Sequence, residues 1–241
     1  MLTSDDIQRY SREGIVFPIP VLTPGEVEIY RTHVDELVEG SKGMALRQLH
    51  LEKRWAYDLG LHPRMLDAVE AILGPDVLVH STLVFYKPAR DAGFVSWHQD
   101  GLYPGLRAPQ LTTAWIALTP SIHENGCLRV LPGSHRGGIL PHREEQTEHN
   151  LLRQGQTIDG IDEAAAIDVI LRPGEMSLHH RDLAHSSNPN HSDLNRIGFV
   201  VRCITPEAQF TGHPVIAARG CADIQQLAAR GVRRIGEPLT C

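Results

Sequence analysis

The sequence has few cysteines, few aromatic residues and no long apolar run. It contains four cysteines and 5% aromatic residues. Cys127, Cys203, Cys221 and Cys241 form no CxxC pair and have no zinc-type spacing, which indicates reduced thiols in a cytoplasmic protein. No stretch approaches the roughly 18 apolar residues of a transmembrane helix. The polar, acidic N-terminus is unlike a signal peptide, so we expect neither membrane insertion nor secretion.

Basic clusters are also missing. The formal net charge is −6 and no run of lysine or arginine occurs, so we expect no nucleic-acid or anionic-membrane partner. A chain of 241 residues with 41% hydrophobic and 22% charged residues suits one globular domain. Nothing in the sequence indicates the oligomeric state. The one unusual abundance is histidine, with 14 residues, and it directs attention to a metal site.

Helix signals dominate residues 1–75. Residues 4–6, Ser-Asp-Asp, can cap a short helix, and residues 23–26, Thr-Pro-Gly-Glu, form a capping box with proline at the first helical position. A third helix is expected to begin after Pro63 and to end at Gly74. We therefore expect mostly helical support in this part of the chain.

The pattern changes to short strands from Asp76 onward. Segments rich in β-branched and aromatic residues alternate with Gly, Pro and Asn turns, and about eight strands of this kind predict an antiparallel sandwich or jelly roll. We assign residues 76–205 to this jelly-roll core, and residues 206–241 to a C-terminal extension with a short helix near 223–230. The polar segment 136–165 has the character of a lid or binding loop.

The segment around residues 97–100, Trp-His-Gln-Asp, carries the first chemical signal. Residues two apart in a strand point to the same face, so His98 and Asp100 would present an imidazole and a carboxylate to one point. Fe(II) of the oxygenase type binds two histidines and one carboxylate on one face and keeps its other positions open. The second histidine must come from elsewhere, and His179, His180 and His185 are the candidates.

Arg196 is the second signal. It lies 11 residues after His185 (196 − 185), beyond a turn at Asn188-Pro189-Asn190, so paired strands would bring the two side chains close. A guanidinium fork suits a carboxylate held by two hydrogen bonds. A dicarboxylate that chelates iron at one end needs such an anchor at the other.

Together these motifs resemble the phytanoyl-CoA dioxygenase family of Fe(II) and 2-oxoglutarate oxygenases. The resemblance is carried by HQD, LHHRDLAHSSNPN and NRIGFVVR, and it extends to REGIVFPIPVL and LTTAWIALTPSIHENGCLRVLPGSHRGG. It covers roughly residues 5–205. It implies a mainly β fold with N-terminal helices, in which the core is a double-stranded β-helix, the cupin-like jelly roll. We expect the whole chain, 1–241, to form a single oxygenase domain.

The resemblance also implies roles for individual residues. His98, Asp100 and His185 match the iron ligands, and Arg196 matches the anchor of the 2-oxoglutarate cosubstrate. Trp115 and Ser187 match positions beside that cosubstrate. The family lines its substrate pocket near four further positions, Phe85, Lys87, Tyr103 and Arg129.

The implied reaction is hydroxylation of a small-molecule metabolite by O2, with release of succinate and CO2. The same iron site could instead support desaturation, cyclisation or epoxidation. The retained carboxylate Asp100 argues against a halogenase, which leaves that position vacant for halide. A module that only binds a metal would have no use for Arg196, and succinate release separates this alternative from an enzyme.

Overall fold

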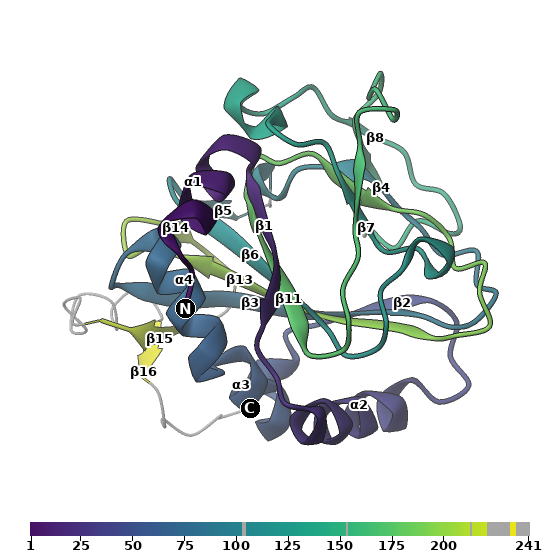
Figure 1. The fold of residues 1–241 in the computed structure, drawn as a ribbon, viewed down its shortest axis with the longest axis horizontal. Coiled ribbons are helices and arrows are strands. Elements are labelled where there is room, and N and C mark those ends of the chain that lie inside the picture. The colour runs from purple at the N-terminus through teal and green to yellow at the C-terminus, as the bar shows by residue number, and fades with distance from the viewer. Residues whose placement is uncertain (103–104, 153, 213, 221–231, 235–241) are drawn as a thin grey trace.

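The computed structural model describes residues 1–102, 105–152, 154–212, 214–220 and 232–234 (Figure 1). Within these ranges, no helix combines the length and the apolar character needed to cross a bilayer. The helix expected near residues 223–230 lies outside the described residues.

Four helices lie in the N-terminal third, and three of them lie where the sequence predicts helices. Thr3 and Thr23 are the N-caps of the first two helices, and each forms a capping box. The Thr3 hydroxyl accepts from the backbone N–H of Asp6 and the Thr23 hydroxyl from that of Glu26, and each acidic side chain accepts from the backbone N–H of its threonine. The short helix that begins at Arg54 was not predicted, because its N-cap residue, Lys53, makes no side-chain capping hydrogen bond. The helices are α1 (Ser4–Glu13), α2 (Pro24–Val38), α3 (Arg54–Gly60) and α4 (Pro63–Leu73).

The major sheet has the strand order β1-β11-β6-β13-β3-β15-β16, and β2 also pairs with β3. Its pairs are antiparallel except for β15 with β16. Its strands are β1 (Ile15–Pro20), β2 (Met44–Arg47), β3 (Val77–Lys87), β6 (Leu111–Ala117), β11 (Glu175–His180), β13 (Arg196–Ile204), β15 (Val215–Arg219) and β16 (Val232–Arg234).

The minor sheet has the order β10-β7-β12-β4, and among the described residues two further pairs of short strands lie outside both sheets. The minor sheet consists of β4 (Val95–His98), β7 (Leu128–Val130), β10 (Ile167–Val169) and β12 (His185–Ser187). The additional pairs are β5 (Leu106–Arg107) with β14 (Gln209–Phe210), and β8 (Arg143–Glu144) with β9 (Gln156–Thr157). The second of these pairs lies in the segment expected to be a binding loop.

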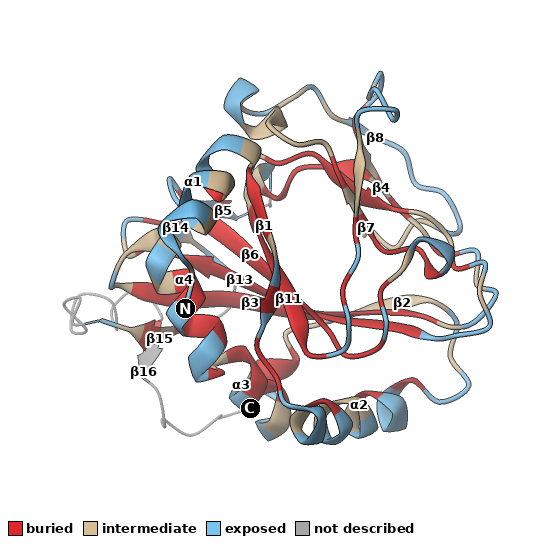
Figure 2. Cartoon of the chain, viewed as in Figure 1, coloured by how far each residue is buried: buried red, intermediate tan, exposed pale blue. Residues whose placement is uncertain are grey.

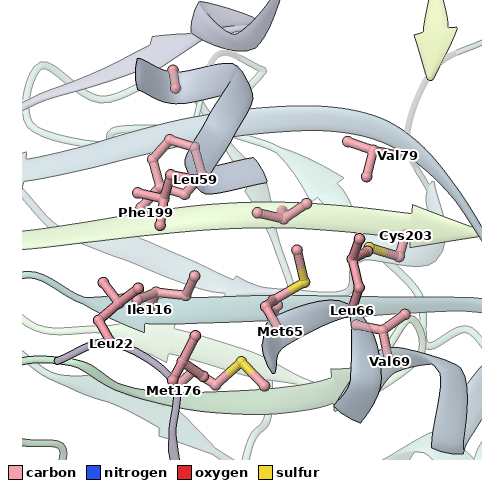
Figure 3. Close-up of a cluster of buried hydrophobic side chains, with 14 of the residues drawn as sticks. Leu22, Leu59, Met65, Leu66, Val69, Val79, Ile116, Met176, Phe199 and Cys203 are labelled. Atoms are coloured by element: carbon pink, nitrogen blue, oxygen red, sulfur yellow. The ribbon is translucent and has the colours of Figure 1, made fainter. Parts of the chain in front are cut away.

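The two faces of the major sheet have different partners. One face packs against the helices, and Met65 and Val69 of α4 belong to one apolar cluster with Ile116, Phe199 and Cys203 of the sheet (Figure 3). Side chains that alternate with these along the strands point to the other face of the major sheet. There Leu83, Trp115 and Val200 form one apolar cluster with Val95 and Leu128 of the minor sheet. Figure 2 shows the strands buried between these layers and the outer sides of the helices exposed. This arrangement is the jelly roll with N-terminal helices that the sequence predicts.

The structure differs from the expected strand plan in three places. Strands β1 and β2 occur in the region expected to be mostly helical, and β15 and β16 extend the sheet from the C-terminal extension. The sequence pattern divides residues 77–87 into two short strands at the polar pair His80-Ser81, but they form one strand in which both polar residues are buried. Long-range pairing with β13 overrides the local polarity there.

Candidate metal and anion site

Three potential ligands meet between adjacent strands of the minor sheet. Strand β4 ends at His98, and β12 begins at His185, which is its partner in the antiparallel register. Asp100 follows at the start of a 3-10 turn, so the chain bends after His98 and does not continue as the straight strand that we expected. One ligand atom each from His98, Asp100 and His185 lies within 4.8 Å of the others. All three residues are buried.

Both imidazoles of this group are held in one tautomer. His98 Nδ1 donates to the Ser96 carbonyl and His185 Nδ1 donates to the Leu183 carbonyl, each at 2.9 Å. A carbonyl can only accept, so Nδ1 carries the proton and Nε2 keeps its lone pair for a metal. Burial lowers the pKa of His98 to about 4 and the pKa of His185 well below its usual value, so both rings are neutral near pH 7.

Asp100 is held by side chains from the major sheet. Thr113 Oγ1 donates to its Oδ2 at 2.7 Å, Arg202 Nη2 donates to its Oδ1 at 2.7 Å, and His179 Nε2 lies 3.6 Å from Oδ2. Burial acts to raise the pKa of Asp100, but Arg202 and the hydrogen-bond donors outweigh it and hold that pKa well below its usual value. The carboxylate is therefore ionised and fixed in orientation, as a metal ligand must be.

The three residues that hold Asp100 form one row across neighbouring strands, which we call the polar row. His179 of β11 is the register partner of Thr113 in β6, and Thr113 is the partner of Arg202 in β13. The sequence interpretation did not identify Thr113 or Arg202, because only the register between distant segments aligns them. It considered His179 for the distal ligand, and the structure places it beside the ligand group but outside it.

His180, the other alternative to His185, points away from this group. Its ring centroid lies 5.1 Å from that of His135, and its Nδ1 accepts from the backbone N–H of Asp182 at 3.0 Å. Of the three candidate histidines, only His185 belongs to the group that could hold a metal ion.

Arg196 provides a buried positive charge near the same group. It is 1% exposed, and its Nε and Nη2 have no hydrogen-bond partner among the described residues. Its Cζ lies 5.4 Å from the ring centroid of Trp115. Burial lowers the pKa of Arg196 to about 10, which leaves it charged near pH 7. A buried cation with open donors fits an anionic ligand such as the distal carboxylate of 2-oxoglutarate.

Two cavities adjoin the ligand group. The smaller one, about 30 Å³, is lined by all three ligand residues and by Trp115, Ser187 and Arg196, so it joins the candidate metal position to the candidate anion position. The larger one, about 400 Å³, opens beside His98 and Asp100. The wall of the larger cavity includes three polar and three apolar side chains: Arg47, Gln154, Gln156, Leu83, Phe85 and Leu152. The segment expected to be a binding loop thus contributes part of that wall.

The four expected substrate residues occupy different surroundings. Phe85 lines both cavities. Lys87 is buried behind Ser187 and lines neither of them. Arg129 of β7 also lines neither, and its Nη1 lies 2.5 Å from Glu163 Oε2. Tyr103 lies outside the described residues.

Comparison with protein families and curated proteins gives consistent matches. Residues 10–198 match the family model of phytanoyl-CoA dioxygenase (PhyH). The chain is 27% identical over 172 residues to a probable alpha-ketoglutarate-dependent hypophosphite dioxygenase of Stutzerimonas stutzeri, with 70% of this chain and 58% of that protein covered. It is 30% identical over 212 residues to 1-deoxypentalenic acid 11-beta-hydroxylase of Streptomyces arenae, with 75% and 72% covered.

Solved structures resemble the fold over most of its length. The apo non-heme monooxygenase ThoJ shares 35% identity at a TM-score of 0.77, with 95% of this chain and 86% of that chain covered. EvdO2 of Micromonospora carbonacea in complex with 2-oxoglutarate shares 22% identity at a TM-score of 0.74, with 89% and 95% covered. The second similarity concerns the fold alone.

Proposed function

Because the chain belongs to the phytanoyl-CoA dioxygenase family, we propose that it is an Fe(II)- and 2-oxoglutarate-dependent dioxygenase that hydroxylates a small-molecule metabolite. One observation carries this proposal: the group of His98, Asp100 and His185 shares a cavity with the buried guanidinium of Arg196. Two neutral imidazoles and one carboxylate form the donor set of non-haem Fe(II) oxygenases. The open donors of Arg196 suit a cosubstrate that is an anion at both ends.

When bound, the iron and 2-oxoglutarate supply the oxidising chemistry, in which O2 gives one oxygen atom to succinate and one to the substrate, with loss of CO2. His98, Asp100 and His185 would hold the metal, each through one ligand atom. Arg196 and Ser187 would hold the distal carboxylate of the cosubstrate, and Trp115 lines the same cavity. All these side chains are buried, so the cosubstrate would bind in a site shielded from bulk solvent.

The larger cavity is the proposed substrate site. Its volume of about 400 Å³ suits a small molecule. Its wall mixes polar side chains, those of Arg47, Gln154 and Gln156, with the apolar side chains of Leu83 and Phe85. We therefore favour a substrate with a polar or anionic group attached to an apolar body. Ectoine dioxygenase of Nocardia farcinica, 29% identical over 153 residues, is another relative whose name refers to a small molecule.

Two broader expectations remain part of the proposal. We propose that residues 1–241 act as one oxygenase domain, since strands from both ends of the chain join the major sheet. We also propose a cytoplasmic location, because Cys127 and Cys203 are free, buried thiols, as is usual in a reducing compartment.

The test is succinate formation by purified protein with Fe(II), 2-oxoglutarate and O2, screened against a panel of metabolites. Mass spectrometry of each product then separates a gain of one oxygen from a loss of two hydrogens, which would indicate desaturation. The His98→Ala variant is the matched control for adventitious iron chemistry. If the wild type produces no more succinate than this control across the panel, and binds no 2-oxoglutarate when metal-loaded, the proposed function is wrong.

A further inference from the structure

Lys87 is buried deeply and every one of its donors is used. It ends β3 and is 0% exposed. Its Nζ donates to Ser187 Oγ at 2.7 Å, to the Ser187 carbonyl at 3.3 Å and to the Asn188 carbonyl at 2.5 Å. An ammonium group has three N–H donors and no acceptor, so three acceptors satisfy it completely. No donor is left to contact a substrate directly, in agreement with its absence from the walls of both cavities.

These contacts fix the direction of the Ser187 hydroxyl. In its ammonium form, Lys87 can only donate, so Ser187 Oγ then accepts from it and the hydroxyl proton points elsewhere. In the described part of the chain, no acceptor takes that proton. Ser187 lines the smaller cavity together with Arg196. The hydroxyl is therefore free to donate to an acceptor inside that cavity.

Lys87 also places a second basic side chain beside Arg196. The two residues are register partners in β3 and β13, and both are almost completely buried. No carboxylate of the described residues forms an ion pair with either side chain. Burial, and then the guanidinium of Arg196, lower the pKa of Lys87 well below its usual value. Two like charges buried side by side are unfavourable, and an anion in the cavity would favour the charged form of Lys87 as well as that of Arg196.

We propose that Lys87 is a positioning residue for the distal carboxylate of 2-oxoglutarate, and that it acts through Ser187, whose hydroxyl it directs toward that carboxylate. The inference rests on the proposed function. It assigns Lys87 to the cosubstrate end of the site and removes it from the substrate pocket where the sequence interpretation placed it.

The test measures binding of 2-oxoglutarate to Ni(II)-loaded protein by calorimetry, for the wild type, Lys87→Met, Ser187→Ala and the double variant. Each single variant should bind 2-oxoglutarate about tenfold more weakly, because each loses a charge-supported hydrogen bond. The double variant should bind about as weakly as Ser187→Ala alone, since Lys87 acts through that hydroxyl. Ni(II) affinity should stay unchanged, and Lys42→Met, at an exposed lysine, should bind like the wild type.

Pyruvate separates positioning from a structural role, because it has the keto-acid end of 2-oxoglutarate and lacks the distal carboxylate. Lys87→Met should bind pyruvate as the wild type does. Three outcomes would overturn the inference. Lys87→Met could lose affinity for pyruvate as much as for 2-oxoglutarate, it could bind 2-oxoglutarate like the wild type, or the losses of affinity of the two single variants could multiply in the double variant. If Lys87→Met does not fold, Lys87→Gln, which removes the charge, takes its place with the same expectations. A wild type that binds no 2-oxoglutarate would refute the proposed function itself, and the inference with it.

Discussion

Gly198 and Trp115 lie so close across β13 and β6 that no side chain fits at position 198. A Cβ atom built on Gly198 would lie 2.1 Å from Cζ2 of Trp115. The same indole ring is the one that Arg196 approaches, with its Cζ 5.4 Å from the ring centroid. The glycine therefore sets the position of the ring, and the ring limits the position of the guanidinium.

Replacing Gly198 by alanine should displace Trp115 and disturb the anion site. We expect the free energy of unfolding to fall by about 1–3 kcal/mol, as for other overpacked cores. Binding of 2-oxoglutarate to the Ni(II)-loaded protein should weaken, while Ni(II) affinity is kept. Gly25→Ala is the control, because a Cβ there meets nothing within 4 Å. Wild-type affinity for 2-oxoglutarate in Gly198→Ala would contradict the role of the Trp115 position.

Removing any one proposed ligand should abolish turnover and weaken metal binding. For His98→Ala, Asp100→Ala and His185→Ala, the loss of affinity should exceed the roughly 10–100-fold typical of changes outside the ligand set. Calorimetry with Ni(II) measures it. His180→Ala is the control, since its ring lies beside His135 and away from the ligand group. If His180→Ala loses metal and His185→Ala retains it, the assignment of the distal ligand is wrong.

Removing the charge of Arg202 from the polar row should lower stability by an amount that depends on whether metal is bound. Arg202→Met leaves the buried carboxylate of Asp100 without its main compensating charge, and breaking such a pair costs roughly 3–5 kcal/mol. We expect that loss in metal-free protein and a smaller one with saturating Ni(II), because the cation then compensates Asp100. Denaturant unfolding with and without metal measures both. An equal loss in the two states would show that Arg202 stabilises the fold independently of the site.

Arg196→Lys should raise the KM for 2-oxoglutarate while metal affinity stays nearly intact. A lysine cannot offer two parallel hydrogen bonds to one carboxylate, and the lost contact should cost roughly 2–5 kcal/mol. Steady-state succinate formation gives the KM, and calorimetry gives the metal affinity. An unchanged KM would remove Arg196 from the cosubstrate site.

Local patterns in the sequence were sufficient for much of the fold. The capping boxes at Thr3 and Thr23 depend on residues three positions apart, so they are visible without any tertiary contact. Runs of β-branched residues between turn formers likewise located most core strands. Strand β1 was missed because Pro18 and Pro20 interrupt its β pattern, and β2 because it has only four residues; both are stabilised by pairing with distant strands of the major sheet.

The sequence by itself also determined the chemistry of the site, because His98 and Asp100 are close along the chain and the spacing of His185 and Arg196 carries a family pattern. Only the tertiary structure decided how these residues are supported. The contacts of Thr113 and Arg202 with Asp100, and of Lys87 with Ser187, join residues 13, 102 and 100 positions apart. Such contacts depend on strand register, and a shift of one residue would turn each of these side chains to the opposite face of the sheet.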